Sequence, residues 1–247
     1  MLGMAMSTMS RARLERRLAR CFSSATSATG KLSVLCFLGT TRNDGPPFPT
    51  RVGSRVAAYS ASLLKKHGHA VEVVDPLELD LPLLRKPEFA YQRGEQPKVL
   101  SELAEAIRSA DAFVMISPEY NHTASPALLN TLNHFGSSIF SYKPSAICTY
   151  SQGQWGGARA AVALRPILSE LGCLPVSAMI HVPAAHTVFD EHGSLIKEES
   201  DWEQYFMRTF SQMEWWAMAA KNHKVLQDPF SLSPALKRQP SQRNAPK

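Results

Sequence analysis

Polar, aromatic and turn-forming residues follow directly on an unbroken apolar run, Phe113-Val-Met-Ile116. Such a run predicts a strand that is buried on both faces, as in parallel sheets covered by helices. The next segment, Ser117-Pro-Glu-Tyr-Asn-His122, leads to Ser125-Pro126, where serine can cap a helix and proline fits the first helical position. Ligands of open α/β sheets bind at the carboxyl ends of the strands. We therefore expect a ligand site in this segment.

Pro118, Glu119, Tyr120 and Asn121 are the candidate contacts of this loop. Its backbone offers donors and acceptors to the edge of a flat ligand, and Tyr120 offers an aromatic face. Asn121 tolerates the unusual backbone angles of a tight turn. An ordinary turn uses the same residue types, so these four residues alone leave a purely structural turn open.

A second candidate loop, Gly39-Thr-Thr-Arg42, follows the predicted strand 32–38. The hydroxyls of Thr40 and Thr41 and the guanidinium of Arg42 suit a phosphate group, which favours charge-assisted hydrogen bonds and helix N-termini. Ser54, at the start of the next predicted helix, is a further candidate. Threonine and glycine are also common in ordinary turns after a strand.

The third candidate loop is Ser151-Gln-Gly-Gln-Trp-Gly-Gly157, after the predicted strand 145–150. Its glycines let the backbone approach a flat ligand closely. The loop lacks a GxGxxG pattern and does not follow the first strand, so a Rossmann nicotinamide site is disfavoured. Its candidate contacts are Ser151, Gln152, Gly153 and Trp155.

Three motifs in these loops carry a family resemblance. Ser117-Pro-Glu-Tyr-Asn121 with Pro126-Ala-Leu-Leu-Asn130 resembles the SPEYN-x-x-x-PGALKNA signature of the NADPH-dependent FMN reductase family of flavodoxin-like quinone, azo and chromate reductases. Residues 39–42 and 51–57 resemble the family's GSTR-like loop and R-x-G-x-R-V-A helix start, with residues 43–50 inserted between them. Gly156-Gly-Ala-Arg159 resembles the end of its SYGGGSGGAR segment.

The resemblance implies FMN as cofactor, held by the three loops, and NADPH or NADH as co-substrate. Hydride would pass through FMN to a small-molecule acceptor, either a quinone, an azo compound, a free flavin or a metal oxyanion. Such chemistry needs no side-chain nucleophile. The family also implies a homodimer or homotetramer, and Trp155, in place of a smaller residue, would narrow the entrance over the flavin.

The apolar periodicity predicts an α/β fold in which five strands alternate with helices. This pattern favours a flavodoxin-like doubly wound parallel sheet of strand order 2-1-3-4-5. We expect the last helix to pack in the core or against another subunit through a stripe of large side chains. The expected strands are residues 32–38, 70–74, 112–116, 145–150 and 176–182, and the stripe is Trp202, Phe206, Phe210, Met213 and Trp216.

The two ends of the chain differ in composition from residues 31–224, which we predict to be one FMN-binding domain. Residues 1–30 are rich in Arg and Ser and nearly free of acids, which is typical of an organelle transit peptide, here a mitochondrial one cut after Phe22. The alternative is an unstructured start with chance basic residues and a cytoplasmic protein. Residues 225–247 have little to bury, and we expect a basic, disordered tail.

Charge and composition exclude several classes of protein. The net charge of +6 comes from the two ends, because residues 32–230 hold 17 basic against 20 acidic side chains. The predicted domain is therefore no basic nucleic-acid binder. No apolar run is long enough to span a membrane. The four cysteines lack ligand spacing and are expected to be buried thiols, and no metal site is predicted.

Two other functions are compatible with the same fold. A flavodoxin-type electron carrier would pass single electrons to a partner protein without turning over a nicotinamide. A sheet that has lost its flavin would act as a partner-binding module. The visible spectrum of the purified protein and its reaction with NADPH and NADH separate these alternatives from a reductase.

Overall fold

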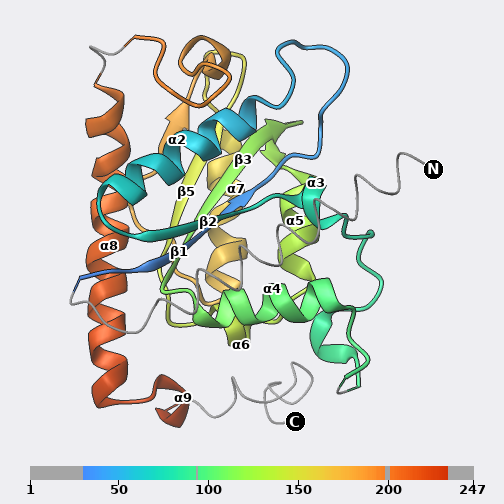
Figure 1. The fold of residues 1–247 in the computed structure, drawn as a ribbon, viewed down its shortest axis with the longest axis vertical. Coiled ribbons are helices and arrows are strands. Elements are labelled where there is room, and N and C mark those ends of the chain that lie inside the picture. The colour runs from blue at the N-terminus through green and yellow to red at the C-terminus, as the bar shows by residue number, and fades with distance from the viewer. Residues whose placement is uncertain (1–29, 93, 198–200, 233–247) are drawn as a thin grey trace.

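The sheet has the predicted architecture (Figure 1). The structure is a computed structural model that describes residues 30–92, 94–197 and 201–232. Five parallel strands lie in the order β2-β1-β3-β5-β6, which is the flavodoxin-like order 2-1-3-4-5 once the short hairpin strand β4 is left out. The strands are β1 (Ser33–Leu38), β2 (Ala70–Val74), β3 (Ala112–Tyr120), β4 (Thr123–Ala124), β5 (Ser145–Tyr150) and β6 (Ile180–Val182).

Helices cover both faces of the sheet, because successive side chains of each buried strand point to opposite sides. In β1, Leu35 and Phe37 pack against α4, α5 and α7, whereas Val34 and Cys36 pack against α2 and α8. The long helices are α2 (Val52–Lys66), α4 (Lys98–Ser109), α5 (Pro126–Asn133), α7 (Ala158–Glu170) and α8 (Trp202–Leu226). The short ones are α3 (Pro76–Leu79), α6 (Ser137–Phe140), α9 (Pro229–Leu232) and the 3-10 turns Glu88–Ala90 and Ala185–Thr187.

The fifth main strand is shorter than expected. Strand pairing with β5 covers only Ile180–Val182 instead of residues 176–182, apart from a single bridge between Pro175 and Ser145. The reason is a side chain of α8: Gln212 Oε1 accepts hydrogen bonds from the Ser177 hydroxyl at 2.9 Å and the Ala178 amide at 3.2 Å. The second of these bonds takes a backbone donor that would otherwise pair with β5.

The aromatic stripe of α8 is confirmed only in part. Phe206, Phe210 and Met213 are buried against the sheet, and Ala217 continues the stripe. Trp216, which we expected in it, lies off this face and is 56% exposed, with its ring 4.7 Å from that of Trp215. The expected tail also differs, since residues 225–232 end α8 and form α9.

Several expectations fall outside the described residues, namely the transit peptide at residues 1–30, of which only Gly30 is described, Cys21, and the tail beyond residue 232. The three described cysteines, Cys36, Cys148 and Cys173, are free, buried thiols. None of the helices in the described residues is long and apolar enough to cross a bilayer. The same residues contain no group of three or more His, Cys, Asp or Glu that could hold a metal ion.

Candidate functional site

The central strand runs further than the apolar pattern indicated and ends in a tight hairpin. β3 continues through the motif to Tyr120, and β4 returns antiparallel, pairing Glu119 with Ala124 and Tyr120 with Thr123. The two turn residues, Asn121 and His122, have φ values of 49° and 62°. Positive φ at both central positions is typical of a two-residue hairpin turn. Asn121 therefore has the tight-turn role that its residue type indicated, at the tip of an extension beyond the main sheet.

Two serines fix this hairpin to α5. The Ser117 hydroxyl accepts a hydrogen bond from the Ser125 amide at 3.1 Å and donates to the Pro118 carbonyl at 2.8 Å. Ser125 caps α5 as predicted, because its hydroxyl accepts from the Ala127 amide at 3.2 Å, and Pro126 occupies the first turn. The direction in which the chain leaves β3 is thus set by hydrogen bonds that are buried.

Glu119 joins the hairpin to the start of α7. Its carboxylate accepts from the backbone amides of Arg159 at 3.0 Å and Ala160 at 3.4 Å, and it pairs with the Arg159 guanidinium at 2.5 Å. Burial raises the pKa of Glu119, but the hydrogen bonds from Arg159 and the two amides outweigh it, and the pKa lies below its ordinary value. The carboxylate is occupied by these bonds to α7. The predicted contact of Glu119 with the cofactor can therefore come only from its backbone.

The second candidate loop, residues 39–42, is held tightly against the end of β3. Gly39 donates from its amide to the Ile116 carbonyl at 2.7 Å, and a Cβ at this position would lie 2.8 Å from the same oxygen. Thr40 is buried; its hydroxyl accepts from the Arg42 amide at 3.2 Å and lies 3.5 Å from the Tyr120 hydroxyl. The first and second candidate loops therefore meet, as parallel strand order predicts. Thr41 is exposed.

Tyr150, the last residue of β5, contributes a third hydroxyl to this place. A Cβ on Gly53, in the first turn of α2, would lie only 2.2 Å from the Tyr150 hydroxyl. The side chain therefore reaches from the sheet to the helix N-terminus. Burial raises the pKa of Tyr150, and the neighbouring Tyr120 raises it further, so the hydroxyl stays protonated. Sequence reasoning missed Tyr150, because its position in an apolar strand indicated core packing.

The inserted residues 43–50 fold back on Arg42. The Nη2 atom of Arg42 donates to the carbonyls of Gly45 at 3.3 Å and Pro47 at 3.2 Å. Both bonds come from one nitrogen of a group that has five N–H donors, so the rest of the guanidinium can serve an anion. Figure 1 shows this segment in blue above the end of β3.

The start of α2 leaves fewer hydroxyl donors than expected. Ser54 donates from both its amide, at 2.9 Å, and its hydroxyl, at 2.8 Å, to the Arg51 carbonyl. Its hydroxyl proton is thus used inside the helix. Arg51 itself has a left-handed backbone and pairs with Asp75 at 2.6 Å. The donors for a phosphate at this helix end are the first backbone amides, those of Val52 and Gly53.

The third loop is anchored to the end of β6. The Ser151 amide donates to the Val182 carbonyl at 3.1 Å, and the Ser151 hydroxyl donates to the Gly153 carbonyl at 2.8 Å. Gln152 reaches across to the insertion, because its side-chain amide donates to the Phe48 carbonyl at 3.3 Å. Trp155 is 61% exposed. All three predicted loops therefore lie at one edge of the sheet and are joined by hydrogen bonds.

Gly157 explains how this loop turns into α7. Its φ is 82°, which favours glycine, and a Cβ would lie 2.7 Å from the Thr149 Cβ. The helix N-terminus can approach β5 closely only because this side chain is missing. The structure thus places a glycine-dependent loop, two threonines, an arginine and a helix N-terminus around the ends of β1, β3 and β5.

Comparison with solved structures assigns the fold. FerB, a flavoenzyme NAD(P)H:(acceptor) oxidoreductase from Paracoccus denitrificans, superposes with a TM-score of 0.59 at 20% sequence identity, covering 76% of this chain and 98% of that one. At this level of identity the likeness concerns the fold. The chain has the flavodoxin-like fold that its strand order defines.

Sequence comparison then assigns the family. Residues 32–187 match the profile of the NADPH-dependent FMN reductase family, and the chain belongs to that family. The NAD(P)H-dependent FMN reductase PA1204 of Pseudomonas aeruginosa is 31% identical over 157 residues, which are 59% of this chain and 82% of that protein. A quinone reductase of Escherichia coli is 33% identical over 142 residues, or 56% and 70% of the two chains. The protein is therefore an NAD(P)H-dependent enzyme that uses FMN.

The donors at the sheet edge fit FMN. A phosphate needs hydroxyl, guanidinium and amide donors, which Thr41, Arg42 and the N-terminus of α2 supply. A flat ring needs an aromatic neighbour and accessible backbone, which the hairpin at Tyr120 and the loop 151–155 supply. The roles of the single residues in binding stay predictions, and the first of them is testable at Arg42.

Replacing Arg42 by alanine should weaken FMN binding by about 10- to 100-fold, the value of one charge-assisted hydrogen bond. Stability should change little, because the side chain is only half-buried and binds carbonyls of its own loop. Titration of the apoprotein with FMN measures the effect. Arg85→Ala, which removes an exposed arginine from another loop, is the matched control. Equal affinities for both variants would mean that the phosphate is held elsewhere.

Proposed function

We propose that this enzyme transfers hydride equivalents from NAD(P)H to a small, flat acceptor, with quinones as the preferred class and azo compounds, free flavins and metal oxyanions as the other candidates. Bound FMN would supply the two-electron chemistry between the two substrates. The observation that carries the proposal is the joining of three loops at the carboxyl edge of β1, β3 and β5, through the Thr40–Tyr120 and Gln152–Phe48 contacts.

Exposed aromatic side chains support a flat acceptor. Phe48 on the insertion is 70% exposed and Trp155 on the third loop is 61% exposed, while Gln152 ties the two segments together. Aromatic faces bind planar rings by offset stacking. The quinone reductase of Escherichia coli and that of Pseudomonas putida, which is 27% identical over 164 residues, are relatives whose names agree with this class.

Steady-state turnover of the FMN-loaded protein tests the proposal. Initial rates with NADPH and with NADH would be measured against a benzoquinone, an azo dye, riboflavin and chromate. We expect the highest kcat/KM for the quinone, and parallel double-reciprocal lines, because one site would serve the two substrates in turn. Intersecting lines would mean that both substrates bind together. Negligible oxidation of either nicotinamide would favour the electron-carrier alternative.

Trp155→Ala should raise kcat/KM for bulky quinones several-fold more than for benzoquinone, because it widens the entrance that Trp155 is proposed to narrow. Trp215→Ala is the matched control, since Trp215 is also exposed but lies on α8. The measurement is the ratio of kcat/KM for a naphthoquinone with a long side chain to that for benzoquinone. An unchanged ratio would show that Trp155 does not border the acceptor.

We further propose that the enzyme is a homodimer or homotetramer that works in mitochondria after removal of residues 1–22. The motivation is the family resemblance for assembly and the Arg-rich, acid-poor composition of the first residues for targeting. Light scattering of the purified protein gives its mass in solution. Amino-terminal sequencing of protein from its native cells gives the first residue, and an intact Met1 on the mature protein would contradict the targeting proposal.

A further inference from the structure

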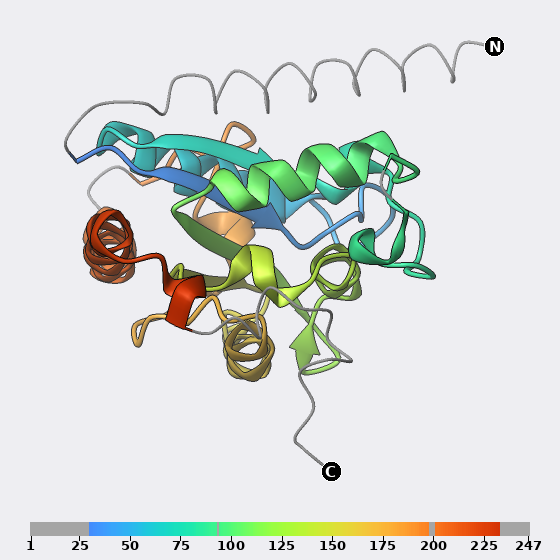
Figure 2. The ribbon, with the colours of Figure 1, turned by 90° about the horizontal axis from the view of Figure 1, so that it is seen from below.

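A cavity of about 710 Å³ lies at the amino-terminal edge of the sheet. Its walls come from the end of α4 before β3, from α6 and the segment before β5, and from the end of α8 with α9. The candidate flavin site lies at the opposite edge, a strand length of roughly 20 Å away. Figures 1 and 2 show α9 beside α6 at this end of the molecule. The volume falls within the range of small-molecule sites, about 300 to 1,000 Å³.

Positive charge dominates the lining. Three basic side chains, Arg108, Lys143 and Lys224, face the cavity together with a single carboxylate, that of Asp228. Ile139 and Phe230 supply apolar surface. A cavity with apolar walls and more basic than acidic side chains is complementary to a molecule that has an apolar body and a negative group.

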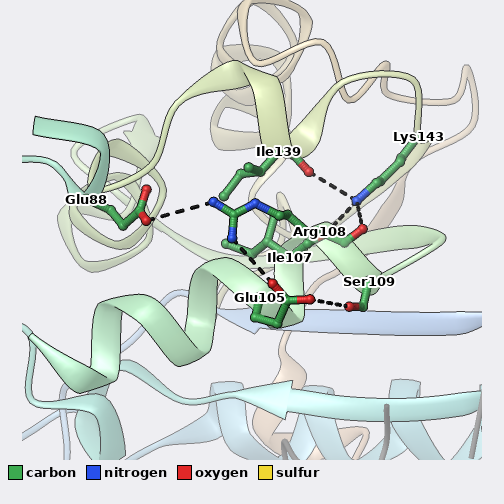
Figure 3. A network of polar contacts seen from close by, with 7 residues as sticks. All are labelled: Glu88, Glu105, Ile107, Arg108, Ser109, Ile139 and Lys143. Carbon is green, nitrogen blue, oxygen red and sulfur yellow. Dashed lines mark hydrogen bonds and ion pairs between the residues drawn. The ribbon is translucent and has the colours of Figure 1, made fainter. Parts of the chain in front are cut away.

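Three backbone carbonyls hold the amino group of Lys143 in a fixed position at this cavity. Its ammonium group donates to the carbonyls of Ile107 at 2.5 Å, Arg108 at 2.8 Å and Ile139 at 3.1 Å, as Figure 3 shows. These bonds use all three of its protons and join the last turn of α4 to α6. Burial lowers the pKa of Lys143 to about 7, and the charge of Lys224 contributes to the shift. The negative charge of a bound anion would raise the pKa of Lys143 again, because it favours the protonated amine.

Arg108 and Lys224 differ in their partners. Arg108 is balanced by Glu105 at 3.4 Å and Glu88 at 3.9 Å (Figure 3). Lys224, in the last turn of α8, is half-buried and makes no hydrogen bond or ion pair with the residues that the structure describes. Burial lowers the pKa of Lys224 as well, although the negative charge of Asp111 acts in the opposite direction. Lys224 is therefore the cation of this cavity that has protons to donate to a ligand.

The apolar wall is built from defined contacts. The ring of Phe230 packs edge-on against Tyr142, with centroids 5.5 Å apart. The Asp228 carboxylate accepts from the Phe230 amide at 3.0 Å, and the Asp228 carbonyl accepts from the Ser231 amide at 3.0 Å. These bonds fold the start of α9, and the ring contact with Tyr142 places it against the segment between α6 and β5. Phe230 thus lines the cavity in a fixed position.

We propose that this cavity binds a small organic anion, a carboxylate or sulfonate with an aromatic body, at a site separate from the flavin. The negative group would pair with Lys224 in the field of Lys143, and the aromatic body would lie against Ile139 and Phe230. The chain's own end does not supply this charge through its side chains, because residues 231–247 contain four basic residues and no acidic one.

The test uses the full-length, FMN-loaded protein and isothermal titration with 2-naphthoate. We expect one binding event in addition to any at the acceptor site, and 2-naphthamide, the neutral analogue, should lack that event. Lys224→Gln should weaken it by about 10- to 100-fold, the value of one charge-assisted hydrogen bond. Lys65→Gln is the matched control, since it removes an equally charged, exposed lysine from α2 on the other side of the sheet.

Two further variants separate the ligand from the fold. Lys224→Arg should retain 2-naphthoate binding, which would show that the loss in Lys224→Gln is not due to misfolding. Phe230→Ala should weaken the binding of 2-naphthoate by several-fold while leaving NAD(P)H oxidation unchanged. Naphthoate binding that is equal in Lys224→Gln and wild type would place the ligand at the flavin site and overturn the proposal. The proposal would also be overturned if the wild type did not bind 2-naphthoate. It would fail as well if 2-naphthamide bound as tightly as 2-naphthoate at the site that depends on Lys224.

Discussion

Replacing Glu119 by alanine should destabilise the protein by about 2 to 4 kcal/mol and weaken FMN binding at the same time. Hydrogen bonds to a charged group contribute about 1.5 to 3 kcal/mol each, but Arg159 is 43% exposed, so its share is reduced by solvent. Only 8% of the Glu119 side chain is exposed, and its removal leaves the amides of Arg159 and Ala160 without this acceptor. Urea unfolding gives the stability, and FMN titration gives the affinity.

The pH dependence of stability gives a second measurement of the same interaction. The pKa of Glu119 is lower in the folded protein than its ordinary value of 4.5. A lowered carboxyl pKa contributes stability at pH values above the unfolded pKa, and this contribution is lost as the pH falls through the folded pKa. The difference in unfolding free energy between wild type and Glu119→Gln should therefore shrink between pH 7 and pH 3.

A double-mutant cycle assigns the effect to the contact with α7. Arg159→Ala removes the guanidinium but keeps the two backbone amides that donate to Glu119. We expect it to cost less than Glu119→Ala, and the two changes together should cost less than their sum. Additive costs would show that Glu119 acts on the hairpin alone. A wild-type FMN affinity in Glu119→Ala would mean that the junction of β3 and α7 does not shape the flavin site.

The main sheet could be predicted because its strands are continuous apolar runs. A run such as residues 113–116 has few alternatives once helices are expected on both sides. The errors come from contacts that cross between distant elements. Gln212 on α8 accepts from the Ala178 amide, which would have paired with β5 in a longer β6, and from the Ser177 hydroxyl. Trp216 is exposed instead of buried because a helix turns 100° per residue. It precedes the buried Ala217 by one position and therefore points away from the buried face.

The site could be predicted to the level of its loops, but the partners of its side chains could not. The strand order brings Thr40 and Tyr120 together, as expected from neighbouring parallel strands. Glu119 finds its partner 40 residues further along the chain. The insertion meets Gln152 across 104 residues. Local residue types do not specify such contacts, because they depend on how the loops fold against each other.

The role of Tyr150 is the clearest example, and Gly53→Ala tests it. Alanine is favoured over glycine in a helix by about 1 kcal/mol, so a free helix would gain stability from this change. In the folded protein the new Cβ would lie 2.2 Å from the Tyr150 hydroxyl and 2.9 Å from the Thr40 Cγ2. We expect net destabilisation by about 1 to 3 kcal/mol, the usual cost of overpacking, and FMN binding weakened by roughly 10-fold or more as the α2 amides are displaced.

A second substitution separates steric displacement from other causes. Tyr150→Phe in the Gly53→Ala background removes the closest atom, although the ring carbon Cζ would remain 2.8 Å away, so it should restore part of the affinity and stability. Ser62→Ala, on the exposed side of α2, is the control for helix propensity and should leave FMN binding unchanged. If Gly53→Ala bound FMN like the wild type, Tyr150 would not set the distance between the second candidate loop, residues 39–42, and α2. A full loss that Tyr150→Phe did not relieve would instead assign the displacement to Thr40, whose methyl group is the other near neighbour.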